Sequence, residues 1–472
     1  FRMLWKLSAK ILIFCMVADI SLASNYSKCN DSYRCRLGSK TPYRCVANYD
    51  ESTLEYPDCV EKKIWLIFRH GTRYPGKKYI PRMIEDLPEL QHVILKNYEN
   101  GATNLSADEA ALFKKWKLSF TQGNMMKLAV EGENEMIDLG ERYQARFPSL
   151  MPEAFNNQTY KVCTTKNSNI LDIYSIFLPS SSAEFQFRFT ATQRTEESAR
   201  HFAVGLFGWH NSKNVWYPLP VYRDRVIRFY KACPRWRQEV DKNLDAKLEK
   251  TKFLDGKIVR NMLDNIKKRI GLNIDYETVN LMYTTCAFET ALNQSIISPW
   301  CKIFSSNDFK KIFEYVEDLE FYWIDGYGYP LTYEQACAAL KDMFDFFGSN
   351  EAAVTTAYFT HSGTILKLIA LLGLAKDAHP LTHDSFVLRK KEDKRAWRSS
   401  IIDTFATNMA FVLYDCEYYG PSVLFMLQER PVYLPGCPKD MPCPLNIMKA
   451  IYPDRDEECQ FDAMCHITKQ GN

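Results

Sequence analysis

The sequence lacks a strong excess of charge, an internal repeat and any low-complexity segment. Its 472 residues contain 60 Lys and Arg and 57 Asp and Glu, for a formal net charge of +3. A chain this close to neutral gives no indication of the broad basic surface that binds nucleic acid or anionic membranes. We therefore expect no nucleic-acid partner, and we expect any recognition of anions to be local.

The sequence also lacks an apolar run long enough to span a bilayer. The segment "ILKLIALLGLA" is interrupted by Lys367 and is shorter than the about 20 residues that a membrane-spanning helix needs. The apolar stretch 11–20 is short as well and contains Asp19. Because lysines precede it and small residues follow it, this stretch is typical of a secretory signal peptide, and a transmembrane anchor is the competing interpretation. We expect residues 1–24 to be a signal peptide, secretion through the endoplasmic reticulum, and no membrane span.

No Cys-x-x-Cys pair occurs among the 15 cysteines, which argues against zinc ribbons and thioredoxin-like sites. Cys15 lies in the expected signal peptide, and the other 14 cysteines form an even set, as disulfides in an oxidising compartment require. Their pairing stays open, although Cys437 with Cys443 and Cys459 with Cys465 are each spaced to close a small loop. No His, Asp or Glu cluster has the spacing of metal ligands, so we expect neither a metal nor another cofactor. Sequons for N-glycosylation begin at Asn25, Asn30, Asn104, Asn157 and Asn293.

The chain does contain a recurring order of strand, polar loop and helix. Strand-like runs occupy 64–68, 185–190 and 354–360, and helical spacing follows each of them. This order predicts an α/β fold. Helical segments such as "FKKIFEYVEDLEFYW", which precedes a turn at "DGYGYPL", predict a helical cap beside the sheet. We expect one unit over 25–472, with an α/β core at about 59–80, 161–232 and 345–435 and a helical cap at about 81–160 and 233–344.

Cationic and imidazole side chains follow the ends of all three strands. The first strand leads into "RHGTRYP", with Arg69, His70 and Arg73; Arg194 follows the second strand and His361 the third. Because ligands bind at the carboxyl ends of the strands in open α/β sheets, we expect these side chains to surround one point. Guanidinium groups match phosphate oxygens bidentately. An imidazole among them is placed to accept a phosphoryl group and pass it to water.

Each of these residues also has a purely structural interpretation. The loop at His70 would then be a solvated basic turn, Arg194 a helix-surface arginine, and His361 a histidine packed in the core. Ser362 and Thr364 are good N-cap residues for the apolar helix that follows. The coincidence of three strand ends favours the phosphate pocket over these interpretations.

At these residues the chain resembles the histidine acid phosphatases. The segment "RHGTRYP" matches their Arg-His-Gly-x-Arg-x-Pro loop at every specified position. Blocks such as "TATQRTEESARHFAVGLFG", "DLEFYWIDGYGYPL" and "LPGCPKDMPCPL" are similar to the multiple inositol polyphosphate phosphatase branch, over most of the chain after Cys59. The resemblance implies a Rossmann-like, phosphoglycerate-mutase-like three-layer α/β sandwich with an α-helical cap, and phosphorylated inositols, including phytate, as substrates. It also implies a site with His70 as the phosphorylated nucleophile, His361 as the second catalytic histidine, and Arg69, Thr72, Arg73 and Arg194 as phosphate ligands.

The chain departs from the family directly after its second histidine. Most members have His-Asp there, and the inositol phosphatases have His-Ala-Glu, whose acid protonates the leaving oxygen; this chain has His361-Ser362-Gly363-Thr364. Loss of a positioned proton donor typically costs about 10²–10⁴-fold in rate. We expect a secreted phosphomonoester hydrolase that is slow unless a substrate phosphate or a distant carboxyl supplies the proton. The alternatives are an impaired relative that binds or sequesters phosphorylated ligands, and a structural glycoprotein that does neither.

Overall fold

The computed structural model describes residues 32–154, 187–215, 217–350, 353–385, 395–452 and 459–467. The expected signal peptide lies outside the described residues, as do Cys29, Cys163 and three of the sequons. Asn104 and Asn293, which begin the other two sequons, are exposed on the surface.

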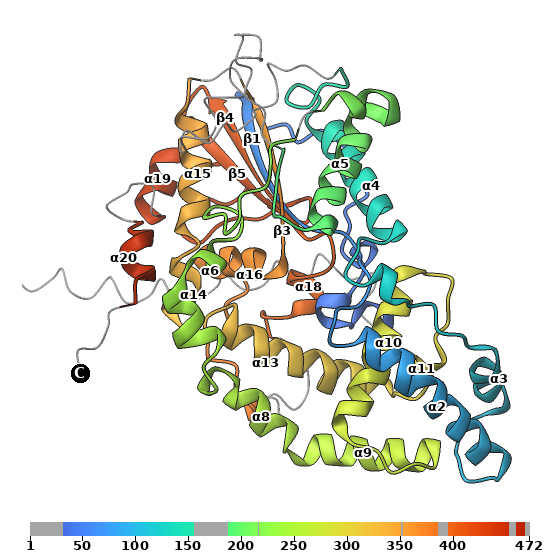
Figure 1. The fold of residues 1–472 in the computed structure, drawn as a ribbon. Helices are drawn as coiled ribbons and strands as arrows, with labels where there is room; N and C mark the ends of the chain where they lie inside the picture. Colours follow the sequence, from blue (N-terminus) through green and yellow to red (C-terminus); the bar gives the residue numbers. More distant parts are fainter. Residues whose placement is uncertain are drawn as a thin grey trace, which may run out of the picture.

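The described chain is built around a seven-stranded mixed sheet with the order β2-β3-β1-β4-β5-β6, in which β7 also pairs with β5 (Figure 1). The pairs of β1 with β3 and of β2 with β3 are parallel, whereas β4 to β7 run antiparallel to their neighbours. The strands are β1 (Cys59–Arg69), β2 (Phe187–Phe189), β3 (Thr355–Thr360), β4 (Asn408–Cys416), β5 (Gly420–Leu427), β6 (Arg430–Pro431) and β7 (Cys443–Pro444). The three strands predicted from the sequence are confirmed as β1, β2 and β3, and the antiparallel half of the sheet adds to them.

Helices cover both faces of the sheet, which explains why the parallel strands are almost continuously apolar. Successive side chains of β1 enter two separate cores, because side chains alternate along a strand. Leu66 and Phe68 pack with residues of α4 (Val130–Arg146) and α5 (Gln193–Asn211). Trp65 and Ile67 pack on the other face, in the core that contains α15 (Cys337–Gly348) and α16 (Ser362–Leu371). The result is the expected three-layer α/β sandwich (Figure 1).

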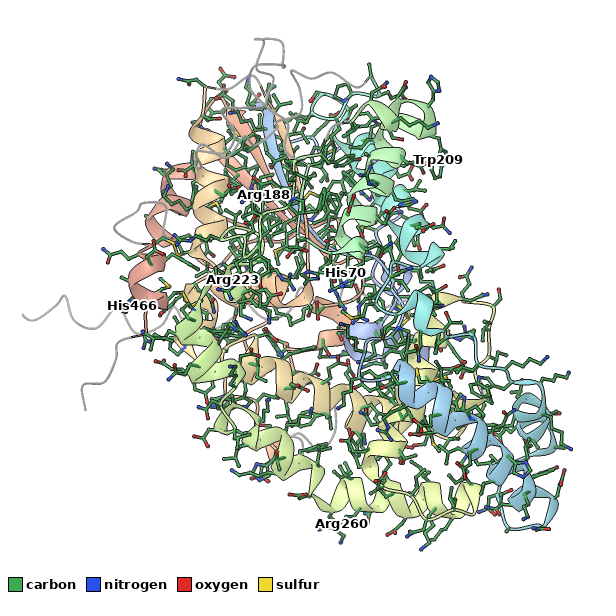
Figure 2. The ribbon with its side chains drawn as sticks, in the orientation of Figure 1. His70, Arg188, Trp209, Arg223, Arg260 and His466 are labelled. Carbon is green, nitrogen blue, oxygen red and sulfur yellow. A yellow bond between two sulfur atoms is a disulfide. The ribbon has the colours of Figure 1, made fainter. Side chains whose placement is uncertain are left out.

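A layer of helices lies against the edge of the sheet where β1 and β3 end (Figure 1), as the sequence predicted for a cap. His70 lies between the sheet and these helices (Figure 2). The positions at which we divide the chain into core and cap stay a prediction. The helices of this layer are α2 (Ile80–Glu99), α3 (Ala107–Lys115), α8 (Leu248–Leu254), α9 (Lys257–Ile270), α10 (Tyr276–Leu292), α11 (Pro299–Lys302), α13 (Glu314–Ile324) and α14 (Pro330–Glu334). Short helices elsewhere are α6 (Phe229–Ala232), α7 (Pro234–Trp236), α12 (Ser306–Asp308), α18 (Ser399–Ile402), α19 (Leu445–Ile451) and α20 (Phe461–Cys465).

Six disulfides join the described cysteines, which suits a secreted or lumenal protein. They are Cys35–Cys45, Cys59–Cys416, Cys233–Cys465, Cys286–Cys301, Cys337–Cys459 and Cys437–Cys443. The expected loop at Cys437 and Cys443 is confirmed. The expected pair of Cys459 with Cys465 is wrong, because the C-terminal segment crosses back over the fold and α20 packs against α7, next to Cys233. Among the helices of the described ranges, none has the length and hydropathy needed to cross a membrane.

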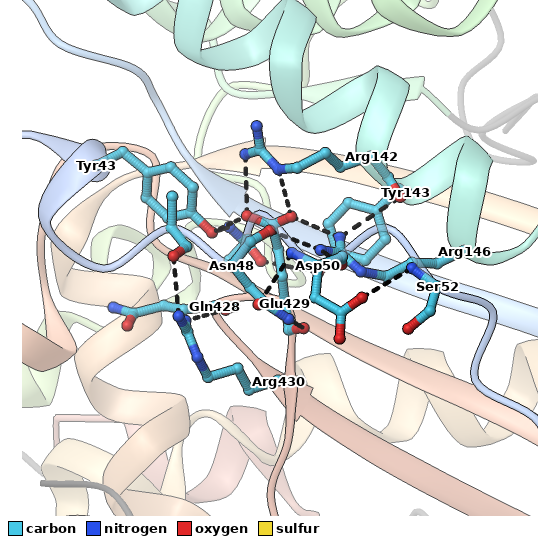
Figure 3. Close-up of polar contacts among 12 residues, drawn as sticks. Tyr43, Asn48, Asp50, Ser52, Arg142, Tyr143, Arg146, Gln428, Glu429 and Arg430 are labelled. Atoms are coloured by element: carbon cyan, nitrogen blue, oxygen red, sulfur yellow. Dashed lines mark hydrogen bonds and ion pairs between the residues drawn. The ribbon is translucent and has the colours of Figure 1, made fainter. Parts of the chain in front are cut away.

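A buried carboxylate ties α4 and the N-terminal segment to the end of β5 (Figure 3). Glu429 is fully buried and accepts hydrogen bonds from Arg142 Nε at 2.7 Å, Arg146 Nη1 at 2.6 Å and the Tyr43 hydroxyl at 2.6 Å. We call these four residues the Glu429 cluster. Burial opposes a charged guanidinium, but the hydrogen bonds and charge of Glu429 outweigh it and raise the pKa of Arg142. These cations and this anion therefore satisfy one another within the fold.

Candidate active site

The parallel pairing of β1 with β3 brings the two predicted histidines together. Arg69, the last residue of β1, is in register with Thr360, the last residue of β3, so His70 and His361 follow at the same edge. The His70 amide donates to the Thr360 carbonyl at 3.0 Å. The two imidazole rings lie with their centroids 5.5 Å apart. Both side chains are buried, His70 at 3% and His361 at 7% exposure.

The predicted arginines surround these rings. Burial is the largest cause that lowers the pKa of His70 well below its usual value, and the charges of Arg194, Arg69 and Arg73 add to it. Arg194 lies in the first turn of α5 and donates from Nη2 to Nδ1 of His361 at 3.3 Å. The structure thus brings five predicted site residues around one point, whereas their roles in binding and catalysis stay predictions.

Hydrogen bonds fix the protonation of both rings. Nδ1 of His70 lies 2.9 Å from the carbonyl oxygen of Gly71. Because a carbonyl oxygen only accepts, this Nδ1 carries the proton, and Nε2 of the neutral ring keeps its lone pair. In His361 the guanidinium of Arg194 only donates, so Nδ1 accepts and Nε2 donates to Thr190 Oγ1 at 2.8 Å. Burial, together with the charges of Arg194 and Arg228, lowers the pKa of His361 well below its usual value.

Buried N–H groups of the arginines have no partner within the protein. The Nε atoms of Arg69, Arg73, Arg194 and Arg228 are buried and make no hydrogen bond. Leaving a buried charged donor unsatisfied is costly, so such groups suit an anion that accepts from several of them. Burial, and after it the charges of neighbouring arginines, lowers the pKa of Arg73 to about 9 and that of Arg194 to about 10.

Arg228 is a site residue that the sequence analysis missed. It lies directly before α6, and its charge acts on both Arg194 and His361. No strand end or motif marks it, since it reaches the site from a segment between the second strand and the cap. Thr190, which orients His361, was missed as a site residue, although it is the last residue of a predicted strand.

Thr72 is fully buried and bound by a carboxylate that the sequence analysis also missed. Its amide donates to Glu135 Oε2 at 2.6 Å and its hydroxyl to Glu135 Oε1 at 2.9 Å. Burial raises the pKa of Glu135 to about 7. Thr72 therefore anchors the loop after β1 to α4, and its predicted role as a phosphate ligand stays a prediction.

Two glycines allow this anchoring. A Cβ atom on Gly71 would lie 2.4 Å from the backbone oxygen of Gly132 in α4, and one on Gly132 would lie 2.2 Å from the oxygen of Thr72. The loop that carries His70 can approach the helix this closely only without side chains at both positions.

Across the described ranges, no three His, Cys, Asp or Glu side chains gather as metal ligands would.

Known proteins are similar to this chain in sequence and in fold. The model of the histidine phosphatase superfamily, branch 2, matches residues 62–428. The chain is 29% identical over 445 residues to multiple inositol polyphosphate phosphatase 1 of Drosophila melanogaster, covering 91% of this chain and 88% of the relative. It is 27% identical over 405 residues to the human protein of the same name, covering 81% and 77%.

Two solved structures have a similar fold. A phytase from D. castellii superposes with a TM-score of 0.69 at 17% identity, covering 91% of this chain and 88% of that one. Multiple inositol polyphosphate phosphatase of Bifidobacterium longum, in complex with inositol hexasulfate, superposes with a TM-score of 0.62 at 15% identity, covering 89% and 98%. The resemblance seen in "RHGTRYP" and the later blocks is confirmed, and the chain belongs to the histidine phosphatase superfamily, branch 2.

Proposed function

We propose that this protein hydrolyses phosphomonoesters of inositol polyphosphates through a phosphohistidine at His70. The observation that carries the proposal is an imidazole with a free Nε2 lone pair among four arginines whose buried Nε groups lack partners. The relatives named as inositol polyphosphate phosphatases and phytases support the substrate class.

The proposed reaction has two steps. Nε2 of His70 attacks phosphorus, and the bond from phosphorus to the inositol oxygen breaks, so that the phosphoryl group is held on nitrogen. Water then attacks the phosphohistidine, which releases phosphate and restores the free imidazole. Arg69, Arg73, Arg194 and Arg228 hold the equatorial oxygens in both steps, and their preorganised charge stabilises the transition state. The leaving oxygen gains one proton in the first step, and the attacking water loses one in the second.

Secretion is part of the same proposal. The six disulfides support an oxidising compartment, and exposed Asn104 and Asn293 are available for glycosylation there.

The second candidate is a protein that binds phosphorylated ligands without turnover, and the absence of a carboxylate at Gly363 favours it. Phosphate release from phytate at pH 4 to 7 separates the two, compared between the wild type, His70→Ala and the matched exposed control His210→Ala. The enzyme predicts release that His70→Ala abolishes and His210→Ala preserves. Tight binding of inositol hexasulfate with equally negligible release from all three proteins would instead establish the binding protein.

A trapping experiment tests the intermediate. Brief reaction with labelled substrate, followed by a denaturing quench in alkali, should leave label on the wild-type chain as a phosphohistidine. A turnover-competent protein that retains no label, or that labels equally with His70→Ala, would contradict the proposed nucleophile.

A further inference from the structure

The proposed reaction, on which this inference rests, needs a proton donor for the leaving oxygen, and Gly363 cannot provide one. A side chain at this position would also be tightly packed, because a Cβ atom there would lie 3.2 Å from Asp325 Oδ1 and 3.3 Å from the ring of Tyr230. A donor from the protein therefore needs another carboxyl group that is connected to the same place.

The residues next to the two histidines both contact one buried carboxyl group, that of Asp403. Arg69 precedes His70, and its Nη1 lies 3.3 Å from Oδ1 of Asp403 and donates to the Asp403 carbonyl. Ser362, which follows His361, donates from its hydroxyl to the other carboxyl oxygen of Asp403. Because the imidazole rings of His70 and His361 are also in contact, Asp403 is connected to both sides of the site.

We propose that Asp403 supplies the proton for the leaving oxygen through the hydroxyl of Ser362. Asp403 directly follows α18, and Ser362 is the first residue of α16, so tertiary packing assembles this pair from two helix ends. Ser362 is half-buried and stands next to His361, whereas Asp403 is fully buried and has no route to substrate other than through a neighbour.

The surroundings of Asp403 keep a proton on it near neutral pH. Burial is the largest cause and raises its pKa to about 7, against the opposing charge of Arg69 from β1 and the hydrogen bond of Ser362 from α16. Glu317 in α13 and Asp325 at the end of α13 also face it, and their negative charges raise its pKa further. Oδ1 of Asp403 is buried and makes no hydrogen bond.

Asp325 is the rival donor, and its own partner argues against it. Its carboxylate pairs with the ammonium of Lys367, which is fully buried. A neutral side chain at Asp325 would leave the buried ammonium of Lys367 without its anionic partner, which is costly.

The relay balances in both steps. When Asp403 is protonated on Oδ2, this oxygen donates to Ser362 Oγ, the reverse of the hydrogen bond made to a charged carboxylate, and the Ser362 hydroxyl turns to the inositol oxygen. As the bond from phosphorus to that oxygen breaks, the inositol oxygen takes the hydroxyl proton of Ser362, and Ser362 takes the carboxyl proton of Asp403. The resulting carboxylate faces Arg69. When water attacks the phosphohistidine, its proton returns through Ser362 to Asp403. Because a hydroxyl both donates and accepts, Ser362 ends each step unchanged.

Dependence on the leaving group tests the relay. An inositol oxygen needs a proton to leave, whereas p-nitrophenol leaves as a stable anion. Asp403→Asn should lower kcat for phytate by about 10²–10⁴-fold, the effect of a lost general acid, and kcat for p-nitrophenyl phosphate only a few-fold. Ser362→Ala should also lower the phytate-to-aryl ratio, which is kcat for phytate divided by kcat for p-nitrophenyl phosphate. Ser362→Thr keeps the hydroxyl and should restore this ratio. The wild-type kcat for phytate should fall above pH 7, and this limb should be missing in Asp403→Asn.

Controls separate the relay from a structural role. Asp342 is a half-buried aspartate whose pKa burial also raises, and it accepts from Trp65 and Tyr358. Asp342→Asn should leave the phytate-to-aryl ratio unchanged. The double variant Asp325→Asn with Lys367→Met tests the rival donor without leaving a buried charge. A selective loss of phytate turnover that persists at pH 5, where Asp403 keeps its proton without the charge of Asp325, would overturn the relay.

The same assay distinguishes the two levels of the proposal. If His70→Ala abolishes turnover of both substrates but Asp403→Asn lowers both equally, the relay is wrong and the proposed function stands. If the wild type releases phosphate from neither substrate, the proposed function fails and the relay fails with it.

Discussion

This protein has two groups of buried arginines, and they differ in whether the protein itself supplies their hydrogen-bond acceptors. In the Glu429 cluster, Arg142 and Arg146 both donate to one carboxylate, and the pKa of Arg142 is raised despite burial (Figure 3). Around His70, the Nε groups of four arginines have no partner, and the pKa of Arg73 is lowered to about 9. The fold therefore supplies the counter-charge of the first group from its own chain, and it leaves the second group suited to an anion from outside.

The largest expected effect lies in the Glu429 cluster. Glu429→Gln should cost about 3–5 kcal/mol in free energy of unfolding, because it leaves two guanidinium groups buried without their anion. Urea unfolding with the disulfides intact measures this loss, and phosphate release per folded molecule should not change. The control is Glu196→Gln, which breaks an exposed ion pair with Arg200 and should cost under about 1 kcal/mol. If Glu429→Gln is no more costly than this control, the cluster does not hold the fold together.

Removal of a site arginine should have the opposite signature. Arg194→Met should lower kcat for phosphate release by about 10²–10³-fold, equivalent to about 2.7–4 kcal/mol of transition-state stabilisation. The free energy of unfolding should stay equal or rise, because the substitution removes the repulsion of Arg194 with Arg69, Arg73 and Arg228. Arg200→Met, on the exposed side of the same helix, is the matched control for kinetics. A less stable protein with full activity would show that Arg194 stabilises the fold, as the arginines of the Glu429 cluster do, and does not bind phosphate.

An added anion should stabilise the protein through the arginines around His70 and not through the Glu429 cluster. Inositol hexasulfate at 100 times its dissociation constant should add about 2.7 kcal/mol to the free energy of unfolding. The gain should be much smaller in Arg228→Met, and chloride at matched ionic strength should not reproduce it. An equal gain in the wild type and in Arg228→Met would place the bound anion elsewhere.

The sequence predicted the residues of the site that follow strands, and it missed those that arrive by tertiary packing. His70 and His361 were predictable because parallel neighbouring strands end at one edge, and Arg194 because α5 begins just after β2. Arg228 and Asp403 lie outside any motif, and only the folded chain brings them to this edge.

Glu135 and the partners of the C-terminal cysteines were missed for the same reason, because their contacts join segments that are distant in sequence. Glu135 reaches Thr72 across the contact of α4 with the loop after β1, which no local pattern encodes. Cys459 and Cys465 are close in sequence, yet each pairs with a cysteine more than 100 residues away. Loop closure by sequence spacing alone could not reveal those partners.

The smallest expected effect is the pH dependence of stability that His70 contributes. Because the folded state holds its pKa well below that of the unfolded chain, the unfolded state binds more protons at pH values just below about 6.5. The contribution of His70 to stability is therefore lost as pH falls through this range, by up to about 1.4 kcal/mol for each pH unit. Below the folded pKa no further loss occurs.

A difference measurement isolates this contribution from Asp403, whose raised pKa makes stability fall as pH rises from about 4 to about 7. The free energy of unfolding of His70→Asn, minus that of the wild type, should grow between pH 7 and pH 5, since Asp403 is present in both proteins and cancels. The exposed control His210→Asn should show no such growth. Saturating inositol hexasulfate should reduce the growth, because bound anions favour a protonated His70 in the folded state. If the difference is the same at pH 5 and pH 8, burial and the arginines around His70 do not lower its pKa in the folded state.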